Sequence, residues 1–583
     1  MNNMKKIFLI LCVVGLITSC DDFFEPKLTN VKNNEIIKND PNIVRGLLTY
    51  AYRAIPDNFE TYWGDFLDCS TDNAVSNVLT SGINKMAYQD GFWTPFSNPL
   101  NNWSAEYDNI RHINDFINRG LGDDIIYYKS DLSKNALYRD RLKGEAYFLR
   151  AWCEFDLLRR FAGYDSDNNL LGVAIVTKVI PADDIPLLPR DSYVDCVTQI
   201  MNDLDTALNA GLQQSYEGAS DILGSQNLGR PTTVACNALK SRVLLYAASP
   251  AFNPSGDKSK WEAAAKASKY VIDQIGTTLP DIYNNATISE DFYNNDQCEE
   301  LIMRKVAGGK NAGDNNVEKR NFPPTVGLIG SGRCNPSQNL VDAFPMANGY
   351  PITDPASGYT NNNMYMNRDP RLDMVVLHNG SIFKGDTIQT YPGGNTVVGA
   401  TGVTDLNVSR TGYYLRKWVS SRANLIVGNT IKDYHYFAVF RNVEMFLNYA
   451  EAANEAYGPD DMTLGMSARD AIREVRRRAG IAKGGEDGYL SSLTTKEQLR
   501  ELIRNERRIE LCFEGHRFFD LRRWKESIVT PVSKVVTTKV NGSFIYKNEV
   551  LDTPIYKEYM YFPPLPKNEL LKSENLRQNQ GWN

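Results

Sequence analysis

Four stretches in the first half of the chain repeat apolar residues at steps of three and four, and this periodicity restricts the folds open to it. In residues 141–161 the repeat includes Leu142, Ala146, Leu149 and Leu157, the pattern of a helix with one buried face. The same pattern occurs in residues 193–210, 234–249 and 259–276. Helix pairs at intervals of a few tens of residues predict a solenoid of helical hairpins, because each pair buries its apolar face against the next.

More helices are predicted in the second half, beginning with residues 439–457, which end at Gly458-Pro459. Three helices begin at a capping box, in which a Ser or Thr is followed three residues later by an acidic or amide side chain. These boxes are Ser259 with Glu262, Ser467 with Asp470, and Thr495 with Gln498.

The segment 306–430 has a different composition. It contains 16 of the 41 glycines and 16 asparagines. Turn-forming residues at this density predict loops and short strands rather than helices. Because loops on a rigid scaffold often carry binding residues, we expect the ligand side of the protein here.

The N-terminus predicts export. Lys5 and Lys6 precede an apolar run that is too short to span a bilayer, so residues 1–19 are interpreted as a signal peptide. The small residues before Cys20 resemble a bacterial lipobox, which would make this cysteine the lipid-carrying first residue of the mature chain. An ordinary cleaved signal with an incidental Cys20 is the alternative.

Composition disfavours several classes of function. The chain has 42% hydrophobic and 23% charged residues and a net charge of −6, so a nucleic-acid partner is not expected. The four histidines are far apart, and no metal site or cofactor is predicted. The cysteines after Cys20 are odd in number and have no CxxC spacing, so we expect buried thiols rather than a disulfide framework.

A carboxylate lies on the apolar face of the helix that begins at Thr495. Leu499, Leu502 and Ile503 lead to Glu506 on the same face, and a buried carboxylate must be paired or protonated. One interpretation is an acid–base pair drawn from this helix and its extension, as in a hydrolase. The other is a buried network with arginines, which bind carboxylates through two parallel hydrogen bonds.

The inward-facing position of Glu506 favours the network, because a substrate cleft needs exposed groups. Under the hydrolase interpretation, Glu506, Glu510 or Glu514 would act with His516. Under the network interpretation we expect ion pairs of Glu506, Arg507, Arg508, Glu510, Glu514, Arg517 and Asp520. No catalytic residue is predicted.

Aromatic residues interleaved with Asp and Asn suggest carbohydrate binding. A sugar presents an apolar face that an aromatic ring can cover and hydroxyl groups that polar side chains can bind. Trp93, in the loop between Gly91 and Pro99, is the first candidate for a stacking platform, and packing of the aromatic residues in the core is the alternative. The full set of glycan-binding candidates is Asp72, Asn73, Trp93, Phe96, Arg333, Asn335 and Trp418.

Six segments of the chain resemble the SusD/RagB family, in the order in which the family has them. They are residues 141–161, 335–352, 441–458, 472–480, 502–524 and 559–582, and the most specific reads ERRIEL followed by EGHRFFDLRRW. The resemblance implies a mostly α-helical fold, a TPR-like α-α superhelix with a loop-rich, short-strand insert. It implies one domain over 20–583, with parts at about 20–305, 306–430 and 431–583.

The same resemblance implies a function. Such a protein is lipid-anchored at Cys20 in the outer membrane, faces the cell exterior, binds oligosaccharides without cleaving them, and delivers them to a SusC-like TonB-dependent transporter. Asp21 and Asp22 resemble the signal that sends lipoproteins to the cell surface. Capture of oligopeptides in the same role, or a carboxylate-type glycosidase, are the alternatives.

Overall fold

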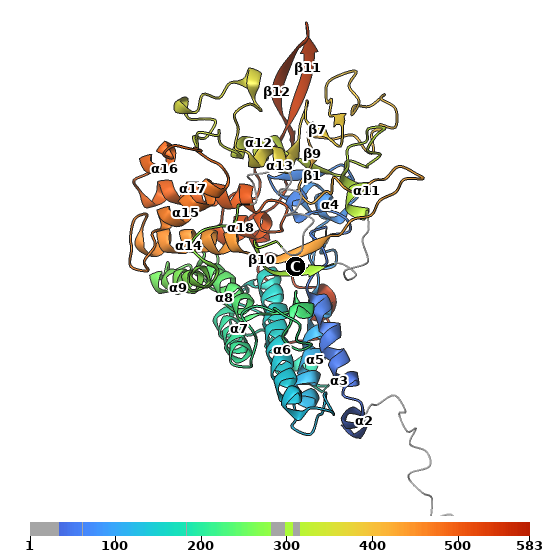
Figure 1. Ribbon diagram of the computed structural model, residues 1–583, viewed down its shortest axis with the longest axis vertical. Helices are drawn as coiled ribbons and strands as arrows, with labels where there is room; N and C mark the ends of the chain where they lie inside the picture. Colours follow the sequence, from blue (N-terminus) through green and yellow to red (C-terminus); the bar gives the residue numbers. More distant parts are fainter. Residues whose placement is uncertain (1–33, 61, 182, 282–297, 307–314, 583) are drawn as a thin grey trace, which may run out of the picture.

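The computed structural model describes residues 34–60, 62–181, 183–281, 298–306 and 315–582. The proposed signal peptide, residues 1–19, and Cys20 lie outside the described residues. The chain is mostly helical, with small two-stranded sheets among its loops. In Figure 1 the N-terminal helices form the lower half, the C-terminal helices lie to the left, and loops and short strands form the top. The predicted mostly α-helical fold with a loop-rich insert is confirmed.

The N-terminal helices pack one against the next along the chain, α5 on α6, α6 on α7, α7 on α8 and α8 on α9. This sequential packing is the helical-hairpin arrangement that the apolar periodicity predicts. The helices are α2 (Asn34–Asn39), α3 (Asn42–Ala51), α4 (Gly82–Tyr88), α5 (Trp103–Gly120), α6 (Leu132–Phe161), α7 (Tyr193–Leu208), α8 (Thr233–Ala248) and α9 (Lys258–Ile275).

The C-terminal helices continue the stack, because α14 packs on α9 and carries α15 and α17 on its other sides. The predicted capping boxes of Ser467 with Asp470 and Thr495 with Gln498 are confirmed. The main helices of this part are α14 (Asn442–Tyr457), α15 (Ala468–Arg478), α16 (Gly488–Ser492), α17 (Lys496–Glu510) and α18 (Arg517–Trp524).

Three predicted helix starts differ from the structure. Helix α6 begins at Leu132, nine residues before the predicted start, because Asp131 caps it by accepting from the backbone of the first turn. Helix α9 is capped by Asp257, so the box predicted at Ser259 is wrong. Helix α14 begins at Asn442, because the residues before it form a strand.

Within the described residues, the strands form six small two-stranded antiparallel sheets. Three of them join distant segments: β1 (Ala74–Ser76) with β5 (Cys334–Pro336), β4 (Leu301–Val306) with β10 (Tyr436–Arg441), and β6 (Val376–Leu377) with β9 (Tyr414–Leu415). The short helices of the loop-rich part are α11 (Asn316–Asn321), α12 (Gln338–Ala343) and α13 (Arg371–Val375). The remaining sheets are β2 (Gly163–Tyr164) with β3 (Leu170–Leu171), β7 (Ile382–Phe383) with β8 (Asp386–Thr387), and β11 (Val532–Val540) with β12 (Ser543–Asp552).

The β11–β12 hairpin projects from the top of the molecule (Figure 1) and was not predicted. Its turn residues Asn541 and Gly542 both have positive φ, 51° and 84°. This is the mirror-image turn that Asn-Gly favours and that matches the twist of paired strands. The Asn-Gly dipeptide was therefore the available sequence signal.

The helical part and the loop-rich part share one continuous apolar core. The cysteines after Cys20 are free thiols, all buried except Cys298, which is half-buried. The C-terminal tail, with a 3-10 helix at Glu558–Tyr561 and the short helix α19 (Lys567–Leu570), returns to the core and buries Trp582. Among the described residues, no helix combines the length and apolar character required to cross a membrane.

Candidate ligand-binding surface

The most exposed tryptophan of the described chain stands on a tight turn. The backbone N–H of Tyr62 donates to the carbonyl of Asp65 at 3.3 Å, and the N–H of Asp65 donates back to Tyr62 at 3.2 Å. Between them Trp63 and Gly64 have φ values of +62° and +88°. A bulky side chain in the left-handed region is rare, and the surroundings must hold it there. The side chain of Trp63 is 86% exposed.

Two arginines support this turn, which we call the Trp63 turn (residues 62–65). Arg333 donates through Nε to Asp65 Oδ1 at 2.7 Å and through Nη2 to the carbonyl of Trp63 at 2.9 Å. Arg320 pairs with the buried carboxylate of Glu60. A Cβ at Gly64 would lie 2.8 Å from Arg320 Cδ and 2.9 Å from Arg333 Nη1. Only glycine therefore allows both guanidinium groups to pack under the turn.

The arrangement is suited to a ligand with an apolar face and a polar rim. The indole of Trp63 offers a flat apolar surface to solvent, while the supporting carboxylates of Glu60 and Asp65 are buried. The guanidinium groups of Arg320 and Arg333 keep part of their surface accessible, with exposed side-chain fractions of 31% and 16%. A ring for stacking beside N–H donors can bind a sugar.

Trp93 and Trp418, two of the glycan-binding candidates, are buried and cannot stack on a ligand from solvent. Trp93 is 3% exposed and meets the rings of Tyr556 and Trp582 edge-on, and its Nε1 donates to Asn98 Oδ1 at 3.0 Å. Trp418 is 5% exposed, and its Nε1 donates to the carbonyl of Phe513 at 3.1 Å. The loop that carries Trp93 is itself covered by the C-terminal tail, which the sequence pattern did not reveal.

Asp72, Asn73 and Asn335 are also buried and serve the scaffold. Asp72 forms ion pairs with Arg508 and Arg517 at 3.0 and 2.9 Å. Burial opposes ionisation of Asp72, but these two arginines outweigh it and lower the pKa of this carboxyl below its ordinary value. Asn73 accepts from Arg508, and Asn335 donates to the carbonyl of Gly332.

Phe96 and Arg333 are the candidates that reach the surface. Phe96 is 74% exposed on a turn closed by backbone hydrogen bonds between Thr94 and Ser97. Arg333 lies under the Trp63 turn. Trp63 was not among the predicted site residues, although a tryptophan followed by Gly64 and Asp65 was a usable turn signal.

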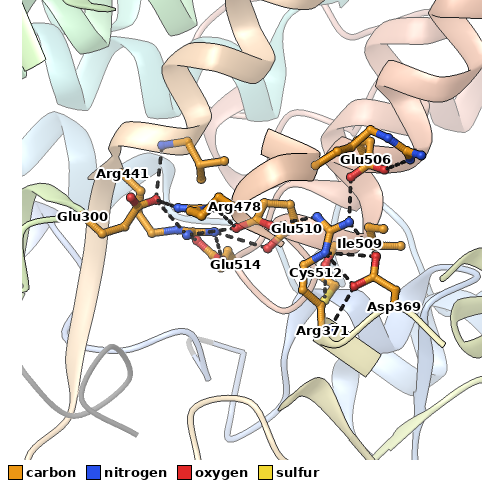
Figure 2. A network of polar contacts seen from close by, with 12 residues as sticks. Glu300, Asp369, Arg371, Arg441, Arg478, Glu506, Ile509, Glu510, Cys512 and Glu514 are labelled. Carbon is orange, nitrogen blue, oxygen red and sulfur yellow. Dashed lines mark hydrogen bonds and ion pairs between the residues drawn. The ribbon is translucent and has the colours of Figure 1, made fainter. Parts of the chain in front are cut away.

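The carboxylates that the hydrolase alternative would use, Glu506, Glu510 and Glu514, lie in a buried ion-pair network (Figure 2). Glu510 is central: its Oε1 accepts from Arg478 at 2.6 Å and Arg441 at 3.3 Å, and its Oε2 accepts from Arg371 at 3.0 Å. Burial favours the neutral acid, but the three guanidinium charges outweigh it and hold the pKa of Glu510 well below its ordinary value. The arginine partners therefore favour the ionised form of Glu510, which suits an ion pair rather than a proton donor.

The network joins segments that are far apart in sequence. Arg371 begins α13, Arg441 ends β10, Arg478 ends α15 and Glu510 ends α17. Glu300, just before β4, binds both Arg441 and Arg478, at 3.2 and 2.9 Å. These pairs hold the C-terminal helices onto the loop-rich part.

All seven residues expected in the network form ion pairs. The pairs are Glu506 with Arg371 and Arg476, Glu510 with Arg371, Arg441 and Arg478, Glu514 with Lys417 and Arg441, Arg507 with Asp520, and Arg508 and Arg517 with Asp72. Burial, with Arg507 beside it, lowers the pKa of His516 well below its ordinary value, so this ring is neutral. In the part of the chain that the structure describes, no group of three or more His, Cys, Asp or Glu side chains could hold a metal ion.

Comparison with known families gives two matches that together span most of the chain. A family model described as "SusD family" matches residues 299–582. A second, described as "Starch-binding associating with outer membrane", matches residues 27–245.

Individual proteins are similar over nearly their whole length. The SusD-like protein P38 of Formosa agariphila is 22% identical over 574 residues, which cover 95% of this chain and 97% of the relative. The crystal structure of a SusD-like protein from Bacteroides fragilis has a TM-score of 0.72 at 27% identity, covering 94% of this chain and 98% of that one. A laminarin-binding SusD-like protein has a TM-score of 0.59 at 19% identity, covering 93% and 99%.

Proposed function

Because the chain belongs to the SusD/RagB family, we propose that it is a non-enzymatic surface lipoprotein that binds oligosaccharides and delivers them to a SusC-like TonB-dependent transporter. The matched family description names starch binding and the outer membrane, and one similar structure is described as laminarin-binding. Both descriptions name a polysaccharide ligand, and this supports carbohydrate as the cargo.

The observation that carries the proposal is the Trp63 turn. Its indole is 86% exposed although the turn places it in a strained backbone region. Leaving a large apolar ring in water and holding it at positive φ both cost free energy. A bound sugar that covers the ring would give this arrangement a function, because C–H groups of the sugar would replace water on the indole face.

The absence of catalysis in this proposal is supported by the state of the carboxylates. The glycosidase alternative needs an acid and a base that reach a substrate. Glu506, Glu510 and Glu514 are buried and paired with cations. They therefore suit a scaffold rather than an active site.

Affinity electrophoresis of residues 21–583 through gels containing starch, laminarin and other polysaccharides tests the binding. We expect retardation by at least one glycan, which Trp63→Ala weakens and Tyr270→Ala, at an exposed position on helix α9, leaves unchanged. Incubation of the same samples with the glycan should release no sugar. Released products, or equal retardation of the Trp63→Ala variant, would contradict the proposal.

The lipid anchor has its own test. We expect Cys20→Ala to move the protein from the membrane fraction to the soluble fraction, because acyl chains on Cys20 would supply the membrane affinity. Retention of this variant in washed membranes would overturn the anchor while leaving the glycan proposal intact.

Oligopeptide capture is the second candidate, and one cavity favours it. A groove of about 610 Å³ beside α5 is lined by apolar and charged residues. The apolar ones include Trp103, Tyr107 and Leu576, and the charged ones include Lys178 and Lys572. Such a groove accepts apolar side chains better than sugar hydroxyls. Peptide binding measured by calorimetry, together with no retardation by any glycan, would favour this candidate.

A further inference from the structure

Two buried thiols face each other close to the Trp63 turn. Cys69 lies in the short 3-10 helix Leu67–Ser70, and Cys334 begins strand β5. Their Sγ atoms are 3.5 Å apart, and both side chains are at most 1% exposed. A disulfide bond is about 2.05 Å long, so the two sulfurs would need to approach each other by about 1.5 Å to form one here.

The pair is specific. Seven cysteines follow Cys20, and in the described ranges no other two cysteine sulfurs are in hydrogen-bond contact with each other. Cys196 and Cys512, for example, donate to backbone carbonyls, of Val173 and Ile509. Among the described cysteines, Cys69 and Cys334 are the pair whose sulfurs the fold places in contact.

The position of the pair connects it to the candidate binding surface. Cys334 directly follows Arg333, whose guanidinium holds Asp65 and the carbonyl of Trp63. Cys69 lies four residues after Asp65 on the segment that carries the turn. A bond between these sulfurs would tie the segment that presents Trp63 to the segment that supports it.

We propose that Cys69 and Cys334 form a disulfide in the exported protein and that this bond stiffens the Trp63 turn. Export to an oxidising compartment rests on the proposed function; the choice of partners rests on the geometry alone. Thiols persist in reducing compartments, whereas exported chains meet oxidants.

The reaction is a thiol–disulfide exchange with an oxidised protein dithiol of the export pathway as the oxidant. The Cys69 thiolate attacks one sulfur of the oxidant's disulfide, forms a mixed disulfide and expels one thiolate. The Cys334 thiolate then attacks the Cys69 sulfur and expels the second thiolate. The two expelled thiolates take up the two protons that Cys69 and Cys334 lose, so one disulfide forms in this chain and the oxidant's disulfide becomes two thiols.

Burial sets the order of events. Burial, with Cys69 beside it, raises the pKa of the Cys334 thiol well above its ordinary value, so the folded, reduced chain contains little reactive thiolate. The exchange therefore takes place during folding, before the core closes over the sulfurs. Once formed, the bond is shielded from soluble reductants by the same burial.

Counting thiols tests the proposal. Residues 21–583 are exported to a bacterial periplasm behind a cleavable signal, quenched in acid, and alkylated with N-ethylmaleimide in denaturant. Mass spectrometry should find five of the seven cysteines alkylated, all seven after prior reduction, and one linked peptide pair containing Cys69 and Cys334. Seven alkylated cysteines without reduction, or a linkage between other cysteines, would overturn the proposal.

Matched variants make the count diagnostic. Cys69→Ser should leave six free thiols, because Cys334 loses its partner, whereas Cys236→Ser on helix α8 should leave four and keep the linked pair. Six free thiols in the Cys236→Ser variant would assign the bond to Cys236 and contradict the proposal.

The effect on the Trp63 turn is measured separately. Unfolding and refolding under reducing conditions should lower the thermal midpoint of the wild type by several degrees and weaken retardation by a bound glycan at least threefold, with no change in the Cys69→Ser variant. An unchanged wild type would refute the stiffening. If no glycan binds at all, the thiol count still decides the disulfide, so failure of the proposed function is distinguishable from failure of this inference.

Discussion

The Trp63 turn and the ion-pair network around Glu510 both contain side chains of types that often bind ligands. They differ in whether any of these side chains remains exposed to solvent after the contacts inside the protein are made. In the network the charges of Glu510 are met by three guanidinium groups inside the protein. In the turn the carboxylate of Asp65 is also met internally, by Arg333, but the indole of Trp63 remains 86% exposed. A dense set of functional groups indicates a binding site only where the fold itself does not use them.

The largest expected effect comes from breaking the network. Glu510→Ala leaves Arg371, Arg441 and Arg478 buried without a shared counter-charge, so we expect a loss of about 3–5 kcal/mol in the free energy of unfolding. Chemical denaturation monitored by circular dichroism measures it.

Glu549 provides the control for that measurement. It pairs with Lys547 on the exposed β11–β12 hairpin, and we expect Glu549→Ala to leave stability unchanged. If Glu510→Ala and Glu549→Ala had equal free energies of unfolding, the buried network would contribute no more to stability than an exposed ion pair.

Trp93→Ala tests whether buried aromatics belong to the scaffold rather than the site. Removing the indole from between Tyr556 and Trp582 should cost about 3 kcal/mol, while glycan affinity of the folded variant stays at the wild-type value. A drop in affinity, measured at a temperature where the variant is fully folded, would return Trp93 to the binding site.

Glu106 shows what happens to a buried carboxylate that cations do not fully neutralise. Burial and the neighbouring charge of Asp156 raise the pKa of Glu106 to about 7. The folded chain then binds this proton more tightly than the unfolded chain does, where the ordinary pKa is 4.5, so stability is lost as the pH rises from 4.5 to 7.

Glu106→Gln removes this titration. Relative to the variant, the wild type should lose roughly 2–3 kcal/mol between pH 5 and pH 8, measured by denaturation at a series of pH values. Parallel pH profiles for the two proteins would show that Glu106 ionises normally.

The smallest expected effect, and the most specific, concerns Trp63. Trp63→Gly should weaken glycan binding by about 1 kcal/mol or more, yet leave stability equal or higher, because glycine adopts a φ of +62° without strain. A large fall in the thermal midpoint of the Trp63→Gly variant would instead show that Trp63, like Glu510, stabilises the fold.

The helices and the network could be predicted because their signals are local. The capping boxes at Ser467 and Thr495 and the position of Glu506 on an apolar face each depend on neighbours within a few residues. The partners of Glu506 and Glu510 could not be assigned in the same way, because Arg371 and Arg441 reach them from segments more than sixty residues away.

The binding surface was harder to predict because exposure is a property of tertiary packing. Trp93 and Trp63 look alike in the sequence, each within a stretch of polar and aromatic residues. The C-terminal tail covers Trp93 by placing Trp582 against it. The residues near Trp93 do not indicate this contact, because its partner lies almost five hundred positions later in the chain.

The projecting β11–β12 hairpin affects how copies of the protein can associate with one another. In the described chain it is a two-stranded sheet, so each strand has an outer edge that could pair with another strand and start self-association. Lys534, Lys539 and Lys547 lie along the ribbon. Lys534 and Lys547 pair with Glu549 on the same ribbon, and charged side chains along an edge strand oppose the addition of another strand.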